Sequence, residues 1–347
     1  MKRRTVLGGL AAGAAVMTGA GRALAQEFTF KLHQPLSANA SAQVNMLEPW
    51  AKAVEENSGG RVKIEIFPSM TLGGRPPELI QQVRDGVVDL IWTVNGYTPG
   101  LFPRSEAFEL PTVYKNDPVA TNLAMHDMFE SDLKEDYKGV EVMFLHVHAG
   151  QALQMRDKEV RSPGDTAGTK LRIPTRTGAW VIESLGAAPT AMPVPELPTA
   201  LQKGVVDGAL IPWEIIPPLK IQDQTEYQIE LNNQERFGNT TFQVAMNQAR
   251  WDSLPDDIKQ AFRDASNRDW WAKVGEIWRK ADDDGLKIAV DSGNTYIALS
   301  EEETETFRQA MAPVVDRWIE EVSDSGIDGA GLVEKARGLI AENAGAQ

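Results

Sequence analysis

The feature that most constrains the fold of this chain is a short pattern that occurs twice, 118 residues apart. The first copy, ELIQQVRDGVVDLIW, begins at Glu78, and the second, ELPTALQKGVVDGAL, begins at Glu196. In both copies GVVD stands at the same offset from the Glu-Leu pair. Chance recurrence is the simplest alternative, because helix-glycine-strand patterns are common. Strand, helix and strand patterns also recur around both copies, however, which favours a repeated structural unit.

Each copy predicts a helix that ends at a glycine and leads into a buried strand. Apolar residues are spaced as on one helical face, and Gly86 or Gly204 stands where a left-handed residue commonly ends a helix. Val-Val-Asp is then expected to open the strand. A helix that leads into a parallel strand is the unit of a doubly wound α/β sheet, so two copies predict two such sheets. Residues 254–290 predict one long helix or a broken pair, and residues 300–345 predict a final pair of helices.

The first 25 residues are typical of an export signal. They combine a basic start, a short glycine-rich apolar stretch and an Ala23-Leu24-Ala25 ending that suits cleavage before Gln26. Arg3-Arg4 also suits a twin-arginine signal, so the export route stays open. No later segment approaches the roughly 18 uninterrupted apolar residues that a membrane span needs. We therefore expect a periplasmic protein that is not membrane-embedded.

Cysteine content and charge exclude several function classes. The chain has no cysteine, so neither a disulfide framework nor thiolate chemistry is available to it. The formal charge is −14, and loss of the four basic residues of the predicted leader takes it to −18. Such an acidic surface repels nucleic acid and anionic lipid. An anionic ligand must therefore be held locally by a particular cationic side chain.

Catalytic motifs are scarce. The sequence has no G-x-S-x-G elbow, no P-loop, no G-x-G-x-x-G after a strand and no H-E-x-x-H. His146 and His148 lie two residues apart on a predicted strand and so share one face, as two metal ligands could. No third ligand stands at a suitable spacing, so we favour hydrogen-bonding histidines at a strand end that also contact a ligand. We predict no metal, no cofactor and no catalytic residue.

Arg172 is the most informative charged residue. It lies in GTKLRIPT, within an apolar strand and just before a proline, where burial of a guanidinium without an anion is costly. Its rigid fork of donors suits a carboxylate, which two parallel hydrogen bonds fix in both position and orientation. The residues alone leave two interpretations open: a ligand carboxylate, or an internal salt bridge to a core Asp or Glu.

The phrases SPGDTAGTKLRIP and LGAAPTAMPVPELPTALQKGVVDGALIPWE resemble the solute-binding proteins of TRAP (tripartite ATP-independent periplasmic) transporters, the DctP family. SMTLGG, VRDGVVDL, PGLFP and RWDSLPDDIKQAF also stand where that family has typical phrases. The resemblance extends over nearly the whole mature chain. It implies an α/β, two-lobed periplasmic binding protein fold, in which two doubly wound domains are joined by hinge strands and a long spanning helix.

The resemblance also implies how the chain divides and what it does. Residues 26–150 with about 238–275 are expected in lobe I, and residues 151–237 with about 276–347, including the C-terminal helices, in lobe II. The lobes would close around one small organic acid held by Arg172. The protein, expected to be a monomer, would then deliver this ligand to the membrane permease subunits.

The predicted pocket departs from the family pattern at two places. A second arginine about 20 residues before Arg172 is missing, since Gly150, Gln151 and Ala152 occupy that neighbourhood, and Ile211 stands in place of the family's asparagine. The pocket becomes more apolar as a result, which disfavours a dicarboxylate or a sugar acid. We favour an aromatic monocarboxylate, such as a hydroxybenzoate or an arylketo acid, over an aliphatic 2-oxo or hydroxy acid.

The other candidate contacts are apolar, aromatic or polar residues near these phrases. An aromatic ligand would stack on aromatic side chains, and its hydroxyl groups would need polar partners. The predicted ligand-binding set is Arg172, Trp213, Asn95, His146, His148, Gln151, Arg75, Met192, Val194, Ile211, Tyr97 and Arg156. Trp92 is predicted as strand core and Trp278 as helix packing. Glu214 is expected to pair with a basic group rather than to hold a cation.

Two rival functions share this architecture. An exported hydrolase would need a nucleophile, an acid-base pair or a metal cluster in the cleft, and no spacing in the sequence identifies one. A periplasmic sensor that reports ligand occupancy to a receptor cannot be told from a transport protein by sequence.

Overall fold

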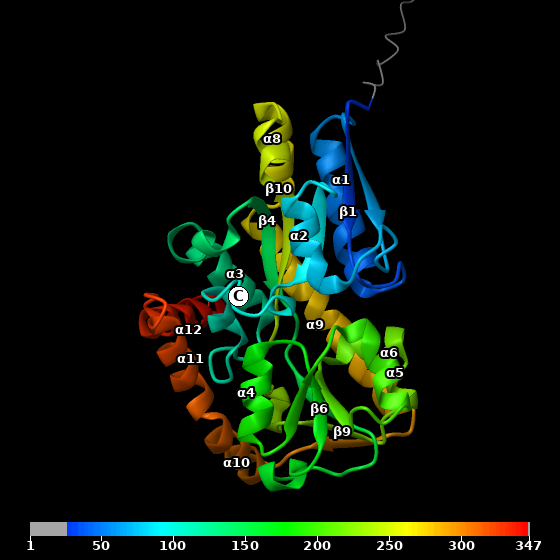
Figure 1. Cartoon of the computed structure of the whole chain (residues 1–347), viewed down its shortest axis with the longest axis vertical. Coiled ribbons are helices and arrows are strands. Elements are labelled where there is room, and N and C mark those ends of the chain that lie inside the picture. Colours follow the sequence, from blue (N-terminus) through cyan, green and yellow to red (C-terminus); the bar gives the residue numbers. More distant parts are fainter. Residues whose placement is uncertain (1–25, 346–347) are drawn as a thin grey trace, which may run out of the picture.

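The computed structural model describes residues 26–345 and arranges them as two α/β lobes, each built on its own sheet (Figure 1). The predicted export signal, residues 1–25, lies outside the described residues. Within residues 26–345, no helix has the length and apolar character that crossing a membrane requires.

The first lobe has a five-stranded sheet of order β2-β1-β3-β10-β4. β1, β2 and β3 are parallel, whereas β10 is antiparallel to both of its neighbours. The strands are β1 (Phe28–His33), β2 (Val62–Phe67), β3 (Leu90–Val94), β4 (Val140–Val147) and β10 (Thr241–Asn247). The accompanying helices are α1 (Glu48–Asn57), α2 (Leu79–Arg84), α3 (Pro118–Met128), α7 (Gln248–Asp252) and α8 (Asp256–Ala265).

The second lobe has a six-stranded sheet of order β11-β9-β5-β8-β6-β7. β6, β7 and β8 are parallel, and β5 enters antiparallel to both β8 and β9. The strands are β5 (Ala152–Met155), β6 (Lys170–Ile173), β7 (Ala188–Ala191), β8 (Gly208–Ile211), β9 (Tyr227–Glu230) and β11 (Thr295–Ala298). The accompanying helices are α4 (Arg176–Ser184), α5 (Leu197–Gln202), α6 (Ile216–Leu219), α10 (Glu301–Met311) and α11 (Pro313–Ser323). The predicted α/β class is confirmed, but each sheet is mixed. The strand that follows each crossing from the other lobe, β10 in the first sheet and β5 in the second, joins its sheet antiparallel to its neighbours.

The two copies of the repeated pattern occupy equivalent places in the two sheets. A short 3-10 turn, Pro76–Glu78 or Val194–Glu196, leads into α2 or α5, and that helix leads into β3 or β8. Gly86 and Gly204 end the two helices with φ of +71° and +66°, as predicted. The strands begin only after the aspartate of GVVD, not at its valines. The orders β2-β1-β3 and β7-β6-β8 correspond, so the repeat does mark one unit in each lobe.

The aspartate of each GVVD links its strand to the adjacent parallel strand. Asp89 Oδ2 accepts a hydrogen bond from the Lys31 N–H at 2.8 Å, and Asp207 Oδ2 accepts one from the Lys170 N–H at 2.7 Å. Each aspartate N–H donates in return to the carbonyl of the same lysine. This reciprocal pair gives a physical reason for the aspartate to recur in both copies.

Three segments connect the lobes. Residues 148–151 lead from β4 to β5, and residues 231–240 lead from β9 to β10. The helix α9 (Arg268–Asp291) packs against α3 and β4 in the first lobe and against residues 213–219 in the second (Figure 1). Residues 254–290 are thus a broken helix pair, in which the Asn267 side chain caps α9 by accepting from the Trp270 N–H.

The C-terminal helices divide between the lobes. α10 and α11 contact α4 of the second lobe, while the last helix, α12 (Gly329–Gly345), lies against α3 of the first lobe (Figure 1). The expectation that all of residues 276–347 belong to lobe II therefore does not describe α12. Its buried residues, among them Leu332, Val333 and Ala336, form an apolar face, and α3 covers the helix.

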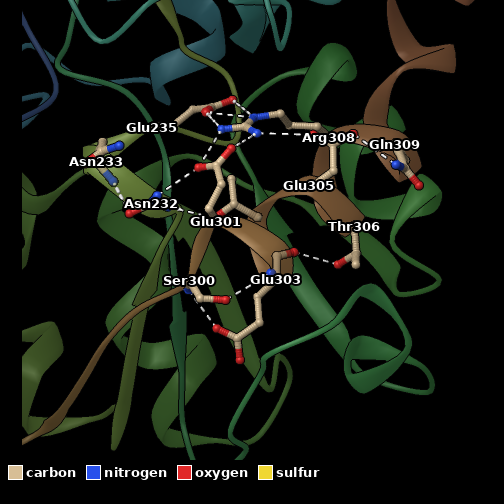
Figure 2. A network of polar contacts seen from close by, with 11 residues as sticks. Asn232, Asn233, Glu235, Ser300, Glu301, Glu303, Glu305, Thr306, Arg308 and Gln309 are labelled. Atoms are coloured by element: carbon tan, nitrogen blue, oxygen red, sulfur yellow. Dashed lines mark hydrogen bonds and ion pairs between the residues drawn. The ribbon is translucent and has the colours of Figure 1, made fainter.

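The crossing from β9 to β10 is held on its outer side by α10 (Figure 2). Arg308 donates to the Glu235 carboxylate from Nε and Nη2, the shortest contact being 2.7 Å, and to Glu301 at 2.6 Å. Ser300 and Glu303 form a reciprocal capping box at the start of α10. The hinge segment is thereby fixed to a helix of the second lobe.

Candidate ligand-binding site

A pocket lies between the lobes, and its empty volume is about 490 Å³, mouth included. Most of its wall is apolar and comes from both lobes and from α9: Pro35, Leu36, Trp92, Val94, Pro174, Val194, Pro212, Ile215, Phe242 and Trp278. The polar lining residues are Tyr97, His148, Gln151, Arg172, Glu214 and Thr240. An apolar pocket with a few convergent polar groups is the usual form of a small-molecule site.

Arg172 carries an unpaired charge in this pocket. Its side chain is buried, with the residue 2% exposed, and it donates from Nε to the Met192 carbonyl at 3.0 Å and from Nη1 to the Leu210 carbonyl at 3.3 Å. No Asp or Glu within residues 26–345 forms an ion pair with it. Burial lowers the pKa of Arg172, and the adjacent Tyr97 hydroxyl opposes this effect. An internal salt bridge is therefore not what holds this guanidinium, and its electrostatics are those of an anion site.

The first lobe has no equivalent cation at the corresponding position. His33 and Arg172 each follow by two residues the lysine that bonds the GVVD aspartate. The His33 imidazole contacts the Gln82 side chain at 2.8 Å and accepts from the Leu72 N–H at 3.3 Å, so its nitrogens are engaged within its own lobe. Of these two corresponding positions, only the one in the second lobe supplies a cation to the pocket.

Tyr97 joins the two lobes beside Arg172. Its hydroxyl accepts a hydrogen bond from the Val194 N–H at 3.0 Å. The preceding residue, Gly96, approaches the second lobe so closely that a Cβ on it would lie 2.2 Å from Cγ2 of Thr175. The lobes are therefore closed over the pocket in this structure.

One wall of the pocket is a set of nearly parallel rings. Phe242 stacks on His146 with ring centroids 4.7 Å apart and on Trp92 at 5.5 Å, both at 3°, and Trp278 lies 5.6 Å from Phe242 at 24°. His146 accepts from the Trp92 indole N–H at 2.9 Å, and burial lowers its pKa to about 3. His146 thus supports the wall as a neutral ring and does not line the pocket. Trp92 and Trp278, predicted as core, do line it, as does Phe242, which the sequence analysis missed.

His148 and Gln151 form a polar cluster in the crossing from β4 to β5. His148 accepts from the Gly150 N–H at 2.8 Å through Nδ1, and its Nε2 lies 3.1 Å from Gln151 Nε2. Gln151 also donates to the Thr240 hydroxyl at 2.7 Å. Burial lowers the pKa of His148 well below its ordinary value, and the nearby His146 and cationic arginines add to the shift. The imidazole is therefore neutral and adds no second positive charge.

Glu214 brings a carboxyl group to the pocket from the turn after β8. Its Oε2 is buried and has no hydrogen-bond partner within residues 26–345. Burial raises the pKa of Glu214 well above its ordinary value, and the Asp282 carboxylate raises it further, while Arg236 acts in the opposite direction. The neutral acid is favoured, so Glu214 does not cancel the charge of Arg172. The expectation that Glu214 pairs with a basic group is not met by any ion pair of the described residues.

Five of the twelve predicted contacts line the pocket: Tyr97, His148, Gln151, Arg172 and Val194. Met192 contributes its carbonyl to Arg172 instead. Trp213 and Ile211 are wholly buried in the second lobe and do not line the pocket. The Trp213 indole N–H donates to Glu230 at 3.0 Å, and its backbone N–H donates to Asp282 at 2.9 Å, which turns the ring away from the pocket.

The remaining predicted contacts serve other purposes. Asn95 is buried in the first lobe and hydrogen-bonded to Tyr137 at 2.9 Å, so its amide is already satisfied. Arg75 is exposed, with 65% of its side chain accessible, and pairs with Glu196 of the other lobe at 2.8 Å. Arg156 is half-buried beside Gly204, away from the pocket. No group of three or more His, Cys, Asp or Glu residues within residues 26–345 is arranged to hold a metal ion.

Comparison with known proteins identifies the family. Residues 35–321 match the DctP family, described as bacterial extracellular solute-binding proteins, family 7. This chain belongs to the DctP family of TRAP solute-binding proteins. The resemblance seen in the sequence is confirmed, and with it the two-lobed fold of that family.

Solved structures of TRAP solute-binding proteins with similar sequences share this fold closely. A TRAP solute-binding protein from Rhodoferax ferrireducens, in complex with copurified benzoate, is 35% identical, with a TM-score of 0.89 over 92% of this chain and 99% of that chain. A marine metagenome protein from an unidentified microbe, specific for aromatic acid ligands and crystallised with 3-hydroxybenzoate, is 36% identical, also with a TM-score of 0.89 over 92% and 99% of the two chains.

More distant relatives are named for other ligands. The ectoine/5-hydroxyectoine-binding periplasmic protein UehA of Ruegeria pomeroyi is 26% identical over 80% of this chain and 82% of that protein. Membership of the family therefore fixes the type of protein without fixing its ligand.

Proposed function

We propose that this DctP-family protein binds a small aromatic monocarboxylate between its lobes and delivers it, outside the cytoplasmic membrane, to the permease of a TRAP transporter. The observation that carries the proposal is the buried guanidinium of Arg172, which lines an aromatic pocket and forms no ion pair with a carboxylate of the described residues. A ligand carboxylate would neutralise this charge through two parallel hydrogen bonds. The rest of the ligand would lie against apolar and aromatic side chains.

The parallel rings of the pocket wall favour a planar ligand. Trp92, Phe242 and Trp278 present nearly parallel planes, and each well-placed aromatic pair adds about 0.5–1.5 kcal/mol beyond area burial. An aliphatic acid of the same size would gain the burial without the stacking. This geometry supports an aromatic acid over the aliphatic 2-oxo or hydroxy acids.

The charge of the pocket supports one carboxylate rather than two. Arg172 is the one cation among the lining residues, so a second anionic group would have no cationic partner in the pocket. The two solved relatives at 35% and 36% identity, in complex with benzoate and 3-hydroxybenzoate, support the same ligand class.

The proposal is tested by comparing benzoate with cyclohexanecarboxylate, which has the same acid group and a six-membered ring without aromaticity. Isothermal titration calorimetry should show benzoate binding several-fold more tightly. Arg172→Ala should abolish binding of both acids, and Arg172→Lys should weaken both strongly because a point charge cannot replace the fork. Arg156→Ala, a half-buried arginine of the same lobe outside the pocket, is the matched control and should bind normally.

Two results would overturn the proposal. One is retained benzoate affinity in a folded Arg172→Ala variant, with folding checked by circular dichroism. The other is equal or tighter binding of cyclohexanecarboxylate, which would remove the reason for an aromatic ligand while leaving a carboxylate site. A thermal-shift screen provides an independent readout, since a ligand at 100 times its Kd stabilises the native state by about 2.7 kcal/mol.

A further inference from the structure

The pocket carries unpaired polar atoms besides the Arg172 guanidinium. Gln151 Oε1, Glu214 Oε2 and Trp278 Nε1 are all buried and have no hydrogen-bond partner within residues 26–345, and all three residues line the pocket. Buried polar atoms are normally hydrogen-bonded, and an unpaired one is costly. When such atoms gather in one pocket, they indicate which groups the bound molecule must supply.

The Gln151 amide has an unpaired end whichever way it is turned. His148 Nδ1 accepts from the Gly150 N–H at 2.8 Å, so the neutral imidazole carries its proton on Nε2. That N–H lies 3.1 Å from Gln151 Nε2, another donor. Rotating the amide by 180° would let its oxygen accept from His148, and its NH₂ would then take the place of the unpaired oxygen. The group without a protein partner is an acceptor in one orientation and a donor in the other.

Glu214 and Trp278 also present hydrogen-bonding groups that a bound molecule would have to satisfy. The neutral carboxyl of Glu214 can donate one hydrogen bond and accept others, whereas the Trp278 indole N–H only donates. Within residues 26–345, Glu214 forms no ion pair with Arg172.

The sheet places Gln151 at a distance from Arg172. β8 lies between β6, which carries Arg172, and β5, which follows Gln151. Ala152 pairs with Ile211 and Arg172 pairs with Ala209, so the backbones on either side of β8 are two strand spacings, roughly 10 Å, apart. A ligand that contacts both Arg172 and Gln151 therefore bridges residues from two segments that β8 separates.

We propose that Gln151, Glu214 and Trp278 form a second anchor, which binds a ring hydroxyl group remote from the carboxylate. A hydroxyl both donates and accepts, so it can satisfy an amide in either orientation, a neutral acid and an indole N–H. A second carboxylate only accepts and would bring a charge that no second cation of the pocket neutralises. This inference rests on the proposed function and narrows its ligand class to meta- and para-hydroxylated aryl carboxylates.

The test is a calorimetric comparison of benzoate with 2-, 3- and 4-hydroxybenzoate on the full-length mature protein. At least one of the meta and para isomers should bind 10-fold or more tightly than benzoate. 2-Hydroxybenzoate should gain nothing over benzoate, because its hydroxyl lies beside the carboxylate. Gln151→Met and Glu214→Leu should each reduce this preference, the ratio of the benzoate Kd to the hydroxybenzoate Kd, to about 2-fold or less.

Two further variants test whether the preference depends on polar side chains that line the pocket. Glu214→Gln keeps the shape and polarity of the neutral acid and should retain the preference. Gln154→Met is the matched control, because Gln154 is buried three residues further along the chain, on β5, but does not line the pocket. This control should retain both affinities.

The outcomes distinguish this inference from the proposed function. Equal affinities of wild-type protein for benzoate and the hydroxybenzoates would overturn the second anchor and leave the aromatic acid site standing. A preference that survives both Gln151→Met and Glu214→Leu would overturn the assignment to these residues. Failure of all four acids to bind would overturn the proposed function itself.

Discussion

Arg236 and Asp282 form a buried ion pair, with Arg236 Nη2 2.8 Å from Asp282 Oδ2, at the point where the β9–β10 crossing meets the spanning helix α9. Arg236 also pairs with Glu230 at the end of β9 and donates from Nε to the Ala149 carbonyl in the β4–β5 crossing at 3.2 Å. Arg236 thus lies on one of the three segments that connect the lobes and contacts the other two. It fixes the hinge side of the pocket from within, while the Glu235–Arg308 pair fixes the same crossing from outside (Figure 2).

Arg236→Met should lower the free energy of unfolding by about 3–5 kcal/mol, because it leaves the buried carboxylates of Asp282 and Glu230 without their cation. Urea denaturation followed by circular dichroism measures this loss. Arg161→Met is the control, since Arg161 is half exposed and pairs with Glu159 at the surface, where an ion pair contributes about 0–1 kcal/mol. Similar losses in the two variants would show that the buried ion pairs of Arg236 stabilise the fold no more than a surface ion pair does.

Glu109 gives the fold a pH dependence of defined sign. Burial, reinforced by the neighbouring Glu106, raises the pKa of Glu109 to about 7, against about 4.3 in an unfolded chain. The folded state therefore binds a proton more tightly, and this contribution to stability is fully present below about pH 4.3 and is lost as pH rises through about 7. The full effect is of order 3 kcal/mol.

Glu109→Gln should remove this dependence, because the amide replaces the neutral acid between Thr177 and Thr241, its partners at 2.7 and 2.8 Å. The variant should be more stable than the wild type at pH 8 and similar at pH 4, as measured by urea unfolding at both values. Glu65→Gln, at an exposed position on β2, should change neither. A wild-type stability that rises between pH 5 and 8 relative to Glu109→Gln would contradict the argument.

The ion pair between Arg75 and Glu196 connects the two lobes at the surface, so it should favour the closed state without touching the ligand. Arg75→Ala should raise the Kd for benzoate by about 2- to 5-fold, as expected for loss of an exposed pair, and the effect should shrink at high salt. The charge swap Arg75→Glu with Glu196→Arg should restore affinity. Lys63→Ala, which breaks the Lys63–Glu55 pair within the first lobe, should have no effect. A salt-independent loss that the swap does not repair would instead place Arg75 in direct contact with the ligand.

The sequence was sufficient to predict the two-lobed architecture and to single out Arg172, which is buried and lines the pocket between the lobes. A charged residue at the end of an apolar strand must have a partner, which made Arg172 conspicuous, and the duplicated helix-glycine-strand pattern predicted two sheets. The aromatic wall could not be predicted in the same way. β3 is buried along its whole length, so no alternation of polar and apolar residues indicates that Trp92 faces the pocket.

Trp213 shows the opposite failure. It stands two residues after the end of β8, close in sequence to residues that do line the pocket. Its side chain turns inward because Glu230 accepts from the indole N–H and Asp282 accepts from the backbone N–H. These partners lie 17 and 69 residues away, on β9 and α9, and only tertiary packing brings them to Trp213. Trp213→Ala should therefore destabilise the second lobe rather than select between aromatic and aliphatic ligands.

Gly96 is the residue on which closure of the lobes depends most directly. A Cβ at this position would lie 2.2 Å from Thr175 Cγ2 and 2.7 Å from Thr175 Cβ, and both atoms belong to the opposite lobe. Real Cβ atoms do not approach other atoms so closely, so Gly96→Ala should hold the lobes apart. The backbone of the first lobe can accept alanine here, because Gly96 is not among the glycines with positive φ.

Gly96→Ala should therefore raise the Kd for benzoate at least 10-fold, since the closed state that completes the pocket becomes less populated. The melting temperature without ligand should change by only a few degrees, because the clash arises between lobes and not within one. Small-angle scattering checks the cause: saturating benzoate should compact the wild type but not the variant. Gly338→Ala on α12, where a Cβ meets nothing within 4 Å, is the control and should bind and compact normally. If Gly96→Ala closes and binds as the wild type does, the contact between Gly96 and Thr175 does not limit closure.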